Sequence, residues 1–262
     1  MYANPRKLAD HVEIESWPDD PNFDVAKERP QRIEKERLQV RDLDRTRKHL
    51  NKLYPFRGKI IEIGSSFGYM LDAFRRDNWS VLGVEPDRHA ARYASNKLGI
   101  ETINSTLEAA KLPSESTDVV VILHVIEHVP DPVGTLREIH RILKPGGHLI
   151  LETPCYDTVM FWLLGHRERS LSCDGHIFFF TSDSLRKAYT SAGFQLEQHD
   201  YTGRSLTIDR MVYNIGIITK SKGLQRIAAS FSRRLQLQKI SVTINLRDIQ
   251  RVCLVKPPIA DS

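Results

Sequence analysis

The chain has 262 residues, 40% of them hydrophobic, which is enough for one sizeable buried core. Its 14 glycines and 13 prolines are ordinary numbers, and they exclude collagen-like and low-complexity chains. The net charge of +5 is concentrated near the C-terminal end, because residues 219–258 hold nine Lys and Arg against one acid. We therefore expect no nucleic-acid partner for the chain as a whole, although the basic segment suits an anionic surface.

Cysteine usage and the N-terminal stretch indicate the cellular compartment. The three cysteines are far apart and form no C-x-x-C pair, as expected for reduced thiols. No apolar run approaches the roughly 18 residues of a membrane span, and residues 1–16 lack the hydrophobic core of a secretion signal. We expect a cytoplasmic protein.

Residues 1–57 consist of an acidic, proline-containing start followed by a densely charged stretch. From Arg32 to Tyr54 the apolar side chains recur at three- and seven-residue intervals, which predicts one long amphipathic helix. Two interpretations remain open for this helix: a solvated helix with one buried stripe, and a lid over a pocket.

Short apolar strands alternate with helical patterns from residue 58 onward. In chain order we predict strand Lys59–Ile63, helix Tyr69–Asn78, strand Ser80–Glu85, helix His89–Leu98, strands Thr102–Ile103 and Asp118–Leu123, helix Pro132–Leu143, strand His148–Thr153, helix Asp183–Ala192, and strands Gln195–Tyr201, Ile240–Leu246 and Arg251–Lys256. Near-continuous Val, Ile and Leu strands between helices predict an α/β fold with a doubly wound, mostly parallel sheet. Such a sheet binds its ligand beyond the carboxyl ends of the strands, where Glu62, Glu85 and His124 fall.

The stretch EIGSSFG at residues 62–68 joins a strand to a helix through two glycines. Glycine allows backbone amides to approach a ligand closely, because it has no Cβ. Dinucleotide enzymes use the spacing G-x-G-x-x-G for an anionic pyrophosphate. Here the spacing is G-x-x-x-G, and Glu62 precedes the first glycine. An acid at this position favours a positively charged ligand.

This stretch resembles the first motif of class I S-adenosylmethionine-dependent methyltransferases, an acid, one residue and then G-x-G-x-G. VLGVEPD at 81–87 is similar to the family's second motif, and residues 105–154 and 176–194 are similar to later segments. The resemblance covers about residues 58–202 and the final strand, and its subgroup includes ubiquinone-type, natural-product and saccharide O-methyltransferases. It implies a Rossmann-like methyltransferase fold with a seven-stranded sheet, an N-terminal helical cap and a C-terminal insertion. The implied segments are 1–57 (irregular start and cap helix), 58–202 (catalytic core), 203–249 (basic insertion on the substrate side) and 250–262 (last core strand and tail).

The resemblance also implies S-adenosyl-L-methionine as the cofactor and assigns residues to it. Glu62 lies near the charged amino-acid end of the cofactor, and Glu85 accepts both ribose hydroxyls, which suits an ionised carboxylate with two acceptor oxygens. The other assigned residues are Gly64, Ser65, Gly68, Pro86, Thr106, Leu107 and Leu123. Two positions depart from the family pattern. Ser66 replaces the middle glycine, and Thr106 stands where an acid often accepts the adenine amino group.

The stretch HVIEH at 124–128 supplies the candidate catalytic residues. Methyl transfer needs alignment and the exclusion of water, and an oxygen acceptor also needs its proton removed. Histidine is the natural general base near neutral pH. We predict His128 as the first candidate and His124 as the second; the alternative for each is a hydrogen-bonded residue at the rim.

The same stretch matches the zinc-protease motif H-x-x-E-H, which requires a helix. Pro130 and Pro132 follow closely and disfavour a helix, so we do not expect a zinc hydrolase. We expect no metal. The alternative is a divalent ion held by His124, Glu127 and His128, as around the corresponding acid–histidine step of some quinone-type relatives.

The resulting prediction is an S-adenosylmethionine-dependent methyltransferase acting on an oxygen of a small-molecule, saccharide or lipid-linked acceptor. The alternatives are a cofactor-binding member without turnover and an NAD-dependent oxidoreductase, which Glu62 and the missing glycine disfavour. Acceptor recognition is expected from residues 1–57, 155–175 and 203–247. The helical pattern at 219–239 predicts packing on its own domain or on a second copy in a homodimer, or else a peripheral membrane contact.

Overall fold

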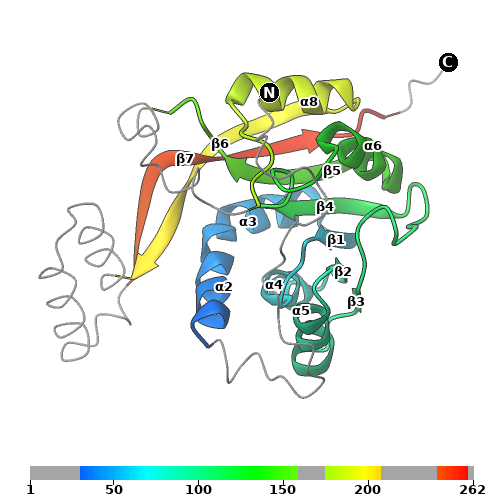
Figure 1. Ribbon diagram of the computed structural model, residues 1–262. Helices are drawn as coiled ribbons and strands as arrows, with labels where there is room; N and C mark the ends of the chain where they lie inside the picture. The colour runs from blue at the N-terminus through cyan, green and yellow to red at the C-terminus, as the bar shows by residue number, and fades with distance from the viewer. Residues whose placement is uncertain (1–29, 159–174, 208–240, 259–262) are drawn as a thin grey trace, which may run out of the picture. The chain divides into compact units, whose positions relative to one another are not determined.

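The computed structural model describes residues 30–158, 175–207 and 241–258 (Figure 1). The chain divides into two compact units, one made of residues 1–202 and 247–262 and the other of residues 203–246. In the second unit the described residues are the end of one strand and the start of the next. The first unit contains the sheet and all the described helices.

The helices are α2 (Pro30–Asp42), α3 (Asp44–Leu53), α4 (Tyr69–Arg76), α5 (Arg88–Tyr93), the π-helical turn η1 (Ala94–Leu98), α6 (Pro132–Ile142) and α8 (Ser182–Ser191). The strands are β1 (Lys59–Ile63), β2 (Ser80–Val84), β3 (Thr102–Ile103), β4 (Thr117–Leu123), β5 (Leu143–Pro154), β6 (Gln195–Thr207) and β7 (Ser241–Val255).

These strands form one seven-stranded sheet in the order β3-β2-β1-β4-β5-β7-β6. The pairs from β3 to β5 are parallel, and β7 is antiparallel to β5. The strand order reverses between β1 and β4, and a doubly wound sheet has its ligand crevice outside the carboxyl ends of the strands at this switch point. The predicted fold class, a doubly wound and mostly parallel seven-stranded sheet, is confirmed.

Both faces of the sheet are covered, as the unbroken apolar strands predict. Alternate residues of each strand point to opposite faces. On one face Ile61, Val120 and Leu149 pack in a cluster with apolar residues of α6 and α8. On the other face Ile60 and Val121 pack with residues of α3 and α4. Figure 1 shows α6 and α8 on one side of the sheet and α4 and α5 on the other.

The prediction of one continuous helix over 32–54 is wrong, because the helix breaks at Leu43. The Leu43 amide bonds to the Val40 carbonyl in a tighter turn, and the Leu43 side chain is buried against the sheet. The break allows α3 to pack on the sheet through Leu50, while α2 packs near α4 through Ile33.

Other predicted boundaries differ. The two predicted strands Ile240–Leu246 and Arg251–Lys256 form one strand, β7, because Ile249 and Gln250 between them pair with β5. Strand β6 continues past its predicted end at Tyr201 to Thr207. The predicted helix His89–Leu98 is α-helical only to Tyr93 and continues as η1. Strand β5 begins at Leu143, five residues before the predicted start. The glycine pair joins the strand because Gly146 and Gly147 exchange backbone hydrogen bonds with Lys256, just beyond the end of β7.

None of the described helices combines the length and apolar character needed to cross a membrane. The amphipathic pattern predicted at 219–239 lies outside the described residues.

Candidate functional site

The glycine turn after β1 adopts a conformation that suits close approach by a ligand. Gly64, Ser66 and Gly68 have φ angles of 72°, 44° and 79°, all in the left-handed region that favours glycine. A Cβ on Gly64 would lie 2.3 Å from Val125 Cγ2, so glycine is required there. Ser66, which departs from the family motif, takes the same type of backbone conformation as a glycine, at a cost of about 1 kcal/mol.

Glu85 follows β2 and is held against this turn. The Ser66 amide donates to Glu85 Oε2 at 2.7 Å, and the Asp87 amide donates to Oε1 at 2.9 Å. Burial raises the pKa of Glu85, although both backbone hydrogen bonds act to lower it. The carboxylate is therefore fixed in orientation by the turn, with further acceptor capacity on each oxygen.

Glu62 lies near the end of β1 and is buried with only 5% of its surface exposed. Its Oε2 has no hydrogen-bond partner among the described residues, and the same holds for the buried Oγ of Ser65. Burial, followed by the charges of Glu36 and Glu85, raises the pKa of Glu62 well above its usual value. A buried carboxylate without a cation is costly, and a cationic ligand would relieve that cost.

Glu36 on α2 is a third carboxylate at this site, and sequence reasoning did not identify it. It accepts from the Ser66 hydroxyl at 2.6 Å and from the Phe67 amide at 3.4 Å. Burial raises its pKa, and the nearby Arg32 acts in the opposite direction. In the sequence Glu36 is one charge among many in a helical stretch, and nothing in the pattern marks it.

The remaining residues assigned to the cofactor occupy neighbouring strand ends and loops. Leu107 is buried in the cluster that contains Ile63 and Val84, and Leu123 is half-buried at the end of β4. Pro86 is exposed, and its carbonyl accepts from the side chain of Asn104 at 2.9 Å. Thr106 is exposed as well.

Thr106 Oγ1 accepts from the Ala109 amide at 3.3 Å. The adenine role assigned to Thr106 stays a prediction. Asn104, which also donates to the Glu85 carbonyl at 2.8 Å, was not anticipated.

His124 is held between two carboxylates. Its Nε2 lies 2.9 Å from Glu152 Oε1, and its Nδ1 lies 3.6 Å from Glu127 Oε1. Burial alone would lower the pKa of this imidazole, but the hydrogen bonds and charges of Glu127 and Glu152 raise it to about 9. His124 is therefore protonated near neutral pH, and in that state it cannot accept a proton.

The His128 ring is held by a backbone carbonyl. Its Nδ1 lies 2.8 Å from the carbonyl oxygen of Gly175. Because a carbonyl only accepts, Nδ1 carries the proton, and Nε2 of the neutral ring is left as the acceptor. The geometry favours His128 over His124 as a proton acceptor.

Residues 124–128 form a bend and a turn and not a helix, as the nearby Pro130 and Pro132 predict. His176 packs edge-on against the His128 ring, with centroids 4.7 Å apart. Donor atoms of Glu127, His128 and His176 converge within 4.8 Å of one another, so the group with metal-ligand spacing includes His176 in place of His124. No pattern of residues joins His176 to this stretch, so only the folded chain shows their proximity.

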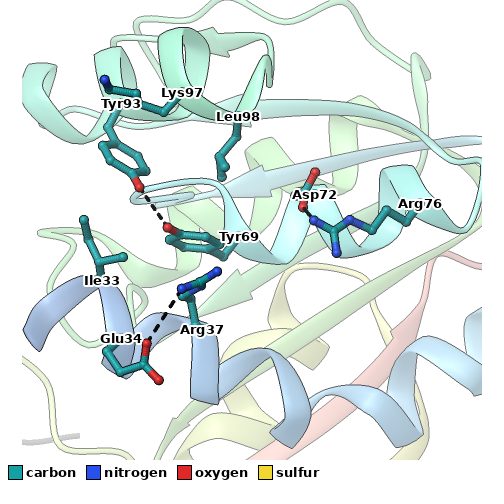
Figure 2. A pocket seen from close by; sticks show the side chains of 9 residues that line it. All are labelled: Ile33, Glu34, Arg37, Tyr69, Asp72, Arg76, Tyr93, Lys97 and Leu98. Atoms are coloured by element: carbon teal, nitrogen blue, oxygen red, sulfur yellow. Dashed lines mark hydrogen bonds and ion pairs between the residues drawn. The ribbon is translucent and has the colours of Figure 1, made fainter. Parts of the chain in front are cut away.

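A surface cleft of about 500 Å³ lies between α2, α4 and η1 (Figure 2). Its lining consists of Ile33, Glu34, Arg37, Tyr69, Asp72, Arg76, Tyr93, Lys97 and Leu98. None of the assigned cofactor residues lines it. The hydroxyls of Tyr69 and Tyr93 meet at 2.8 Å, and the carboxylates of Glu34 and Asp72 pair with Arg37 and Arg76. These polar side chains of the cleft therefore have hydrogen-bond or ion-pair partners within the cleft, whereas Glu62 Oε2 has no hydrogen-bond partner among the described residues.

Comparison with known proteins finds similarity to methyltransferases at the level of the family model, the curated relatives and the solved structures. Residues 25–199 match the family model described as a methyltransferase domain. Ubiquinone biosynthesis O-methyltransferase from Pseudomonas aeruginosa is 33% identical over 101 residues, which is 36% of this chain and 44% of that protein. The protein of the same name from Ralstonia nicotianae is 34% identical over 107 residues, 38% of this chain and 44% of that protein. The matched segment thus spans less than half the length of these curated relatives.

Among solved structures, an S-adenosylmethionine-dependent methyltransferase from Thermotoga maritima has a similar fold. The TM-score is 0.55 at 21% sequence identity, and the match covers 88% of this chain and 98% of that one.

Proposed function

The chain belongs to the methyltransferase-domain family, and we propose that it is an S-adenosylmethionine-dependent methyltransferase acting on an oxygen of a small-molecule acceptor, saccharide and lipid-linked acceptors included. The single observation that carries this proposal is Glu62. It is buried, its Oε2 has no hydrogen-bond partner among the described residues, and it lies beside Glu36 and Glu85 at the switch point of the sheet. This cluster of acids favours a cationic ligand and disfavours a pyrophosphate.

The residues around the turn suit S-adenosylmethionine in charge and in donor set. Glu85, oriented by two backbone amides, would accept the ribose hydroxyls, and Glu62 and Ser65 offer buried polar atoms toward the amino-acid end. When bound, the cofactor supplies a methyl group activated by its sulfonium. The turn between Gly64 and Gly68 would lie against the ligand, since Gly64 has no room for a side chain.

His128 is the proposed general base, because its Nε2 is left as an acceptor by the Nδ1–H bond to Gly175. His124, the second candidate, would instead serve as a fixed positive charge between Glu127 and Glu152. The names of the curated relatives support oxygen as the methylated atom.

The cofactor proposal is tested by calorimetry with S-adenosylmethionine and NAD as separate ligands. We expect binding of the first only, and a loss of at least about 100-fold in affinity for Glu85→Ala, since two hydrogen bonds to a charged group are removed. Preference for NAD, or unchanged affinity in Glu85→Ala, would contradict the proposal.

Catalysis is tested separately from binding. We expect His128→Ala to reduce turnover by about 100-fold or more while S-adenosylmethionine affinity stays within about threefold of wild type. A screen for S-adenosylhomocysteine release over phenolic, saccharide and lipid-linked acceptors supplies the assay. If the wild type binds the cofactor but forms no product with every class of acceptor, the alternative of a binding protein without turnover is favoured.

The partner and compartment predictions belong to the same proposal. They comprise a cytoplasmic location and no nucleic-acid partner. For residues 219–239 they comprise packing on the same domain or on a second copy in a homodimer, with peripheral membrane contact as the alternative. Light scattering tests the dimer, and cosedimentation with anionic vesicles, compared with a variant deleted in 219–239, tests the membrane contact.

A further inference from the structure

A second convergence of polar side chains lies away from the glycine turn, on the face of the sheet covered by α3. His49 on α3, Glu197 on β6 and Cys253 on β7 each direct one donor atom to a common point, within 4.8 Å of one another. Cys253 pairs with Ile150 of β5, toward the amino end of that strand from Glu152. This group is therefore distinct from the residues assigned to cofactor and catalysis.

The distances within the group match those of a coordinated ion. His49 Nε2 lies 3.8 Å from Glu197 Oε1, and Cys253 Sγ lies 3.3 Å from Glu197 Oε2. Ligand atoms on a tetrahedral zinc ion, with bond lengths of about 2.0–2.3 Å, are separated by about 3.3–3.8 Å. An ion at the centre would require only small side-chain adjustments.

The three groups are incompletely satisfied by one another. His49 Nε2 is a buried atom without a hydrogen-bond partner among the described residues. Burial, followed by the Glu197 carboxylate, raises the pKa of the Cys253 thiol, so without an ion the sulfur keeps its proton. The side chains of His49 and Glu197 are each 34% exposed, which gives an ion access from solvent to a sulfur that is 7% exposed.

The Glu197 carboxylate is also held by a hydrogen-bonded neighbour that is not itself a proposed ligand, as metal-ligating carboxylates commonly are. His148 Nε2 lies 3.1 Å from Glu197 Oε2, and the hydroxyl of Tyr54 lies 2.6 Å from His148 Nδ1. The Tyr54–His148 pair thus holds the Glu197 carboxylate in position.

We propose that His49, Glu197 and Cys253 bind a zinc ion. Thiolate and imidazole ligands beside one carboxylate select zinc over magnesium or calcium, which prefer oxygen ligands alone. On binding, the Cys253 S–H bond breaks, its proton passes to solvent, and the sulfur becomes a ligand. Because the three ligands come from positions 49, 197 and 253, the ion would cross-link α3 to β6 and β7 and stabilise the cap on the sheet. The inference does not depend on the proposed methyltransferase activity.

The first experiment measures metal content and spectrum on the full-length protein. After removal of metal with a chelator, titration with zinc alone should give one equivalent bound through this site. Cobalt should give a thiolate-to-metal charge-transfer band, which histidine and carboxylate ligands alone do not produce. Zinc at about 100 times its Kd should raise the Tm by about 5 °C.

Substitutions of the proposed ligands test whether the ion binds at this site. His49→Ala, which alters a partly exposed side chain and keeps the thiol, should weaken zinc binding by more than about 100-fold and abolish the zinc-dependent rise in Tm. Cys253→Ser should remove the charge-transfer band. His148→Phe leaves the ligands in place and should weaken binding by about 10–100-fold.

Matched controls come from the other two thiols and from the other convergent group. Cys155 is also buried beside a carboxylate, with its Sγ donating to Asp157 Oδ1 at 2.7 Å, but it belongs to no described group with metal-ligand spacing. Cys155→Ser, Cys173→Ser and His176→Ala should each retain the charge-transfer band. Absence of the band in wild type, or its persistence with full zinc affinity in His49→Ala, would overturn the proposal.

Discussion

Glu62 and Glu152 occupy equivalent positions in the sheet but have opposite surroundings. Each lies near the carboxyl end of a parallel strand, on the same face of the sheet and two strands apart, and each is about 5% exposed. Glu152 is paired with His124 and Arg251, and although burial acts to raise its pKa, these cations lower it to about 2. Among the described residues, the charges that act on Glu62 are those of the carboxylates Glu36 and Glu85, and with burial as the main cause its pKa is raised well above the usual value.

This difference separates a structural carboxylate from one that is suited to a ligand. The charge of Glu152 is neutralised within the chain, by a guanidinium that also donates to the Asp42 carbonyl at 2.9 Å. The charge of Glu62 is not neutralised within the described residues, so its unfavourable environment persists until a cation arrives. Buried acids of the same type at one sheet edge therefore have different charge environments because of their neighbours, and we expect different functions from them.

The largest expected effect comes from removing the cation of Glu152. We expect Arg251→Met to lower the free energy of unfolding by about 3–5 kcal/mol, because a buried carboxylate loses its partner. Urea denaturation measures the change. As a control, Arg186→Met removes an exposed pair with Asp183, in which both side chains are more than half exposed, and should cost far less stability, because water screens exposed ion pairs. If the two variants lowered the free energy of unfolding equally, the buried Arg251–Glu152 pair would contribute no more to stability than an exposed pair.

The two acids should also give opposite pH dependence. The folded pKa of Glu152 lies below its usual value of 4.5, so its contribution is present above pH 4.5 and is lost as the pH falls toward 2. That contribution amounts to about 3 kcal/mol. The folded pKa of Glu62 is raised, so the unfolded chain loses this proton first, and stability falls as the pH rises above 4.5.

Urea midpoints of wild type, Glu152→Gln and Glu62→Gln over a range of acidic pH test these signs. The advantage of wild type over Glu152→Gln should shrink toward low pH. The advantage of Glu62→Gln over wild type should grow as the pH rises through the weakly acidic range. If the two differences in urea midpoint, each taken as wild type minus variant, changed with pH in the same way in both regions of pH, the contrast between Glu152 and Glu62 would be wrong.

At neutral pH, Glu62→Gln should separate ligand binding from stability. We expect S-adenosylmethionine affinity to fall by about 10–100-fold, since one charge-assisted contact is lost, while the unliganded protein becomes no less stable. Calorimetry and urea denaturation on the same sample measure both quantities. A large loss of stability with full affinity would assign Glu62 to the structural class instead.

The smallest effect concerns the strained turn that faces Glu62. Ser66→Ala and Ser66→Gly both remove the hydroxyl bond to Glu36, but only glycine relieves the left-handed backbone. We therefore expect Ser66→Gly to be more stable than Ser66→Ala by about 1 kcal/mol. Thermal unfolding of the pair measures the difference, and equal stability would mean that the turn is not strained.

The features that depend on residues close together in the sequence could be predicted from the sequence. The runs KIIEI and DVVVIL identify β1 and β4 to within one residue, because a strand buried on both faces has to be apolar throughout. The motifs at 62–68 and 81–87 identified Glu62 and Glu85, since a turn between strand and helix has local residue requirements. Periodicity over 32–54 predicted a helical, amphipathic segment but not its break at Leu43, which depends on packing against the sheet.

The sequence by itself determined the α/β class and the acids at the carboxyl ends of β1 and β2, because strand patterns and glycine turns are set by short-range sterics and burial. Only the tertiary structure decided which charges meet. It brought Glu36 to the glycine turn, Arg251 to Glu152, His176 to His128, and His49 to Glu197 and Cys253. These pairings join residues from about 30 to more than 200 positions apart in the chain, and their energies depend on the burial that folding creates.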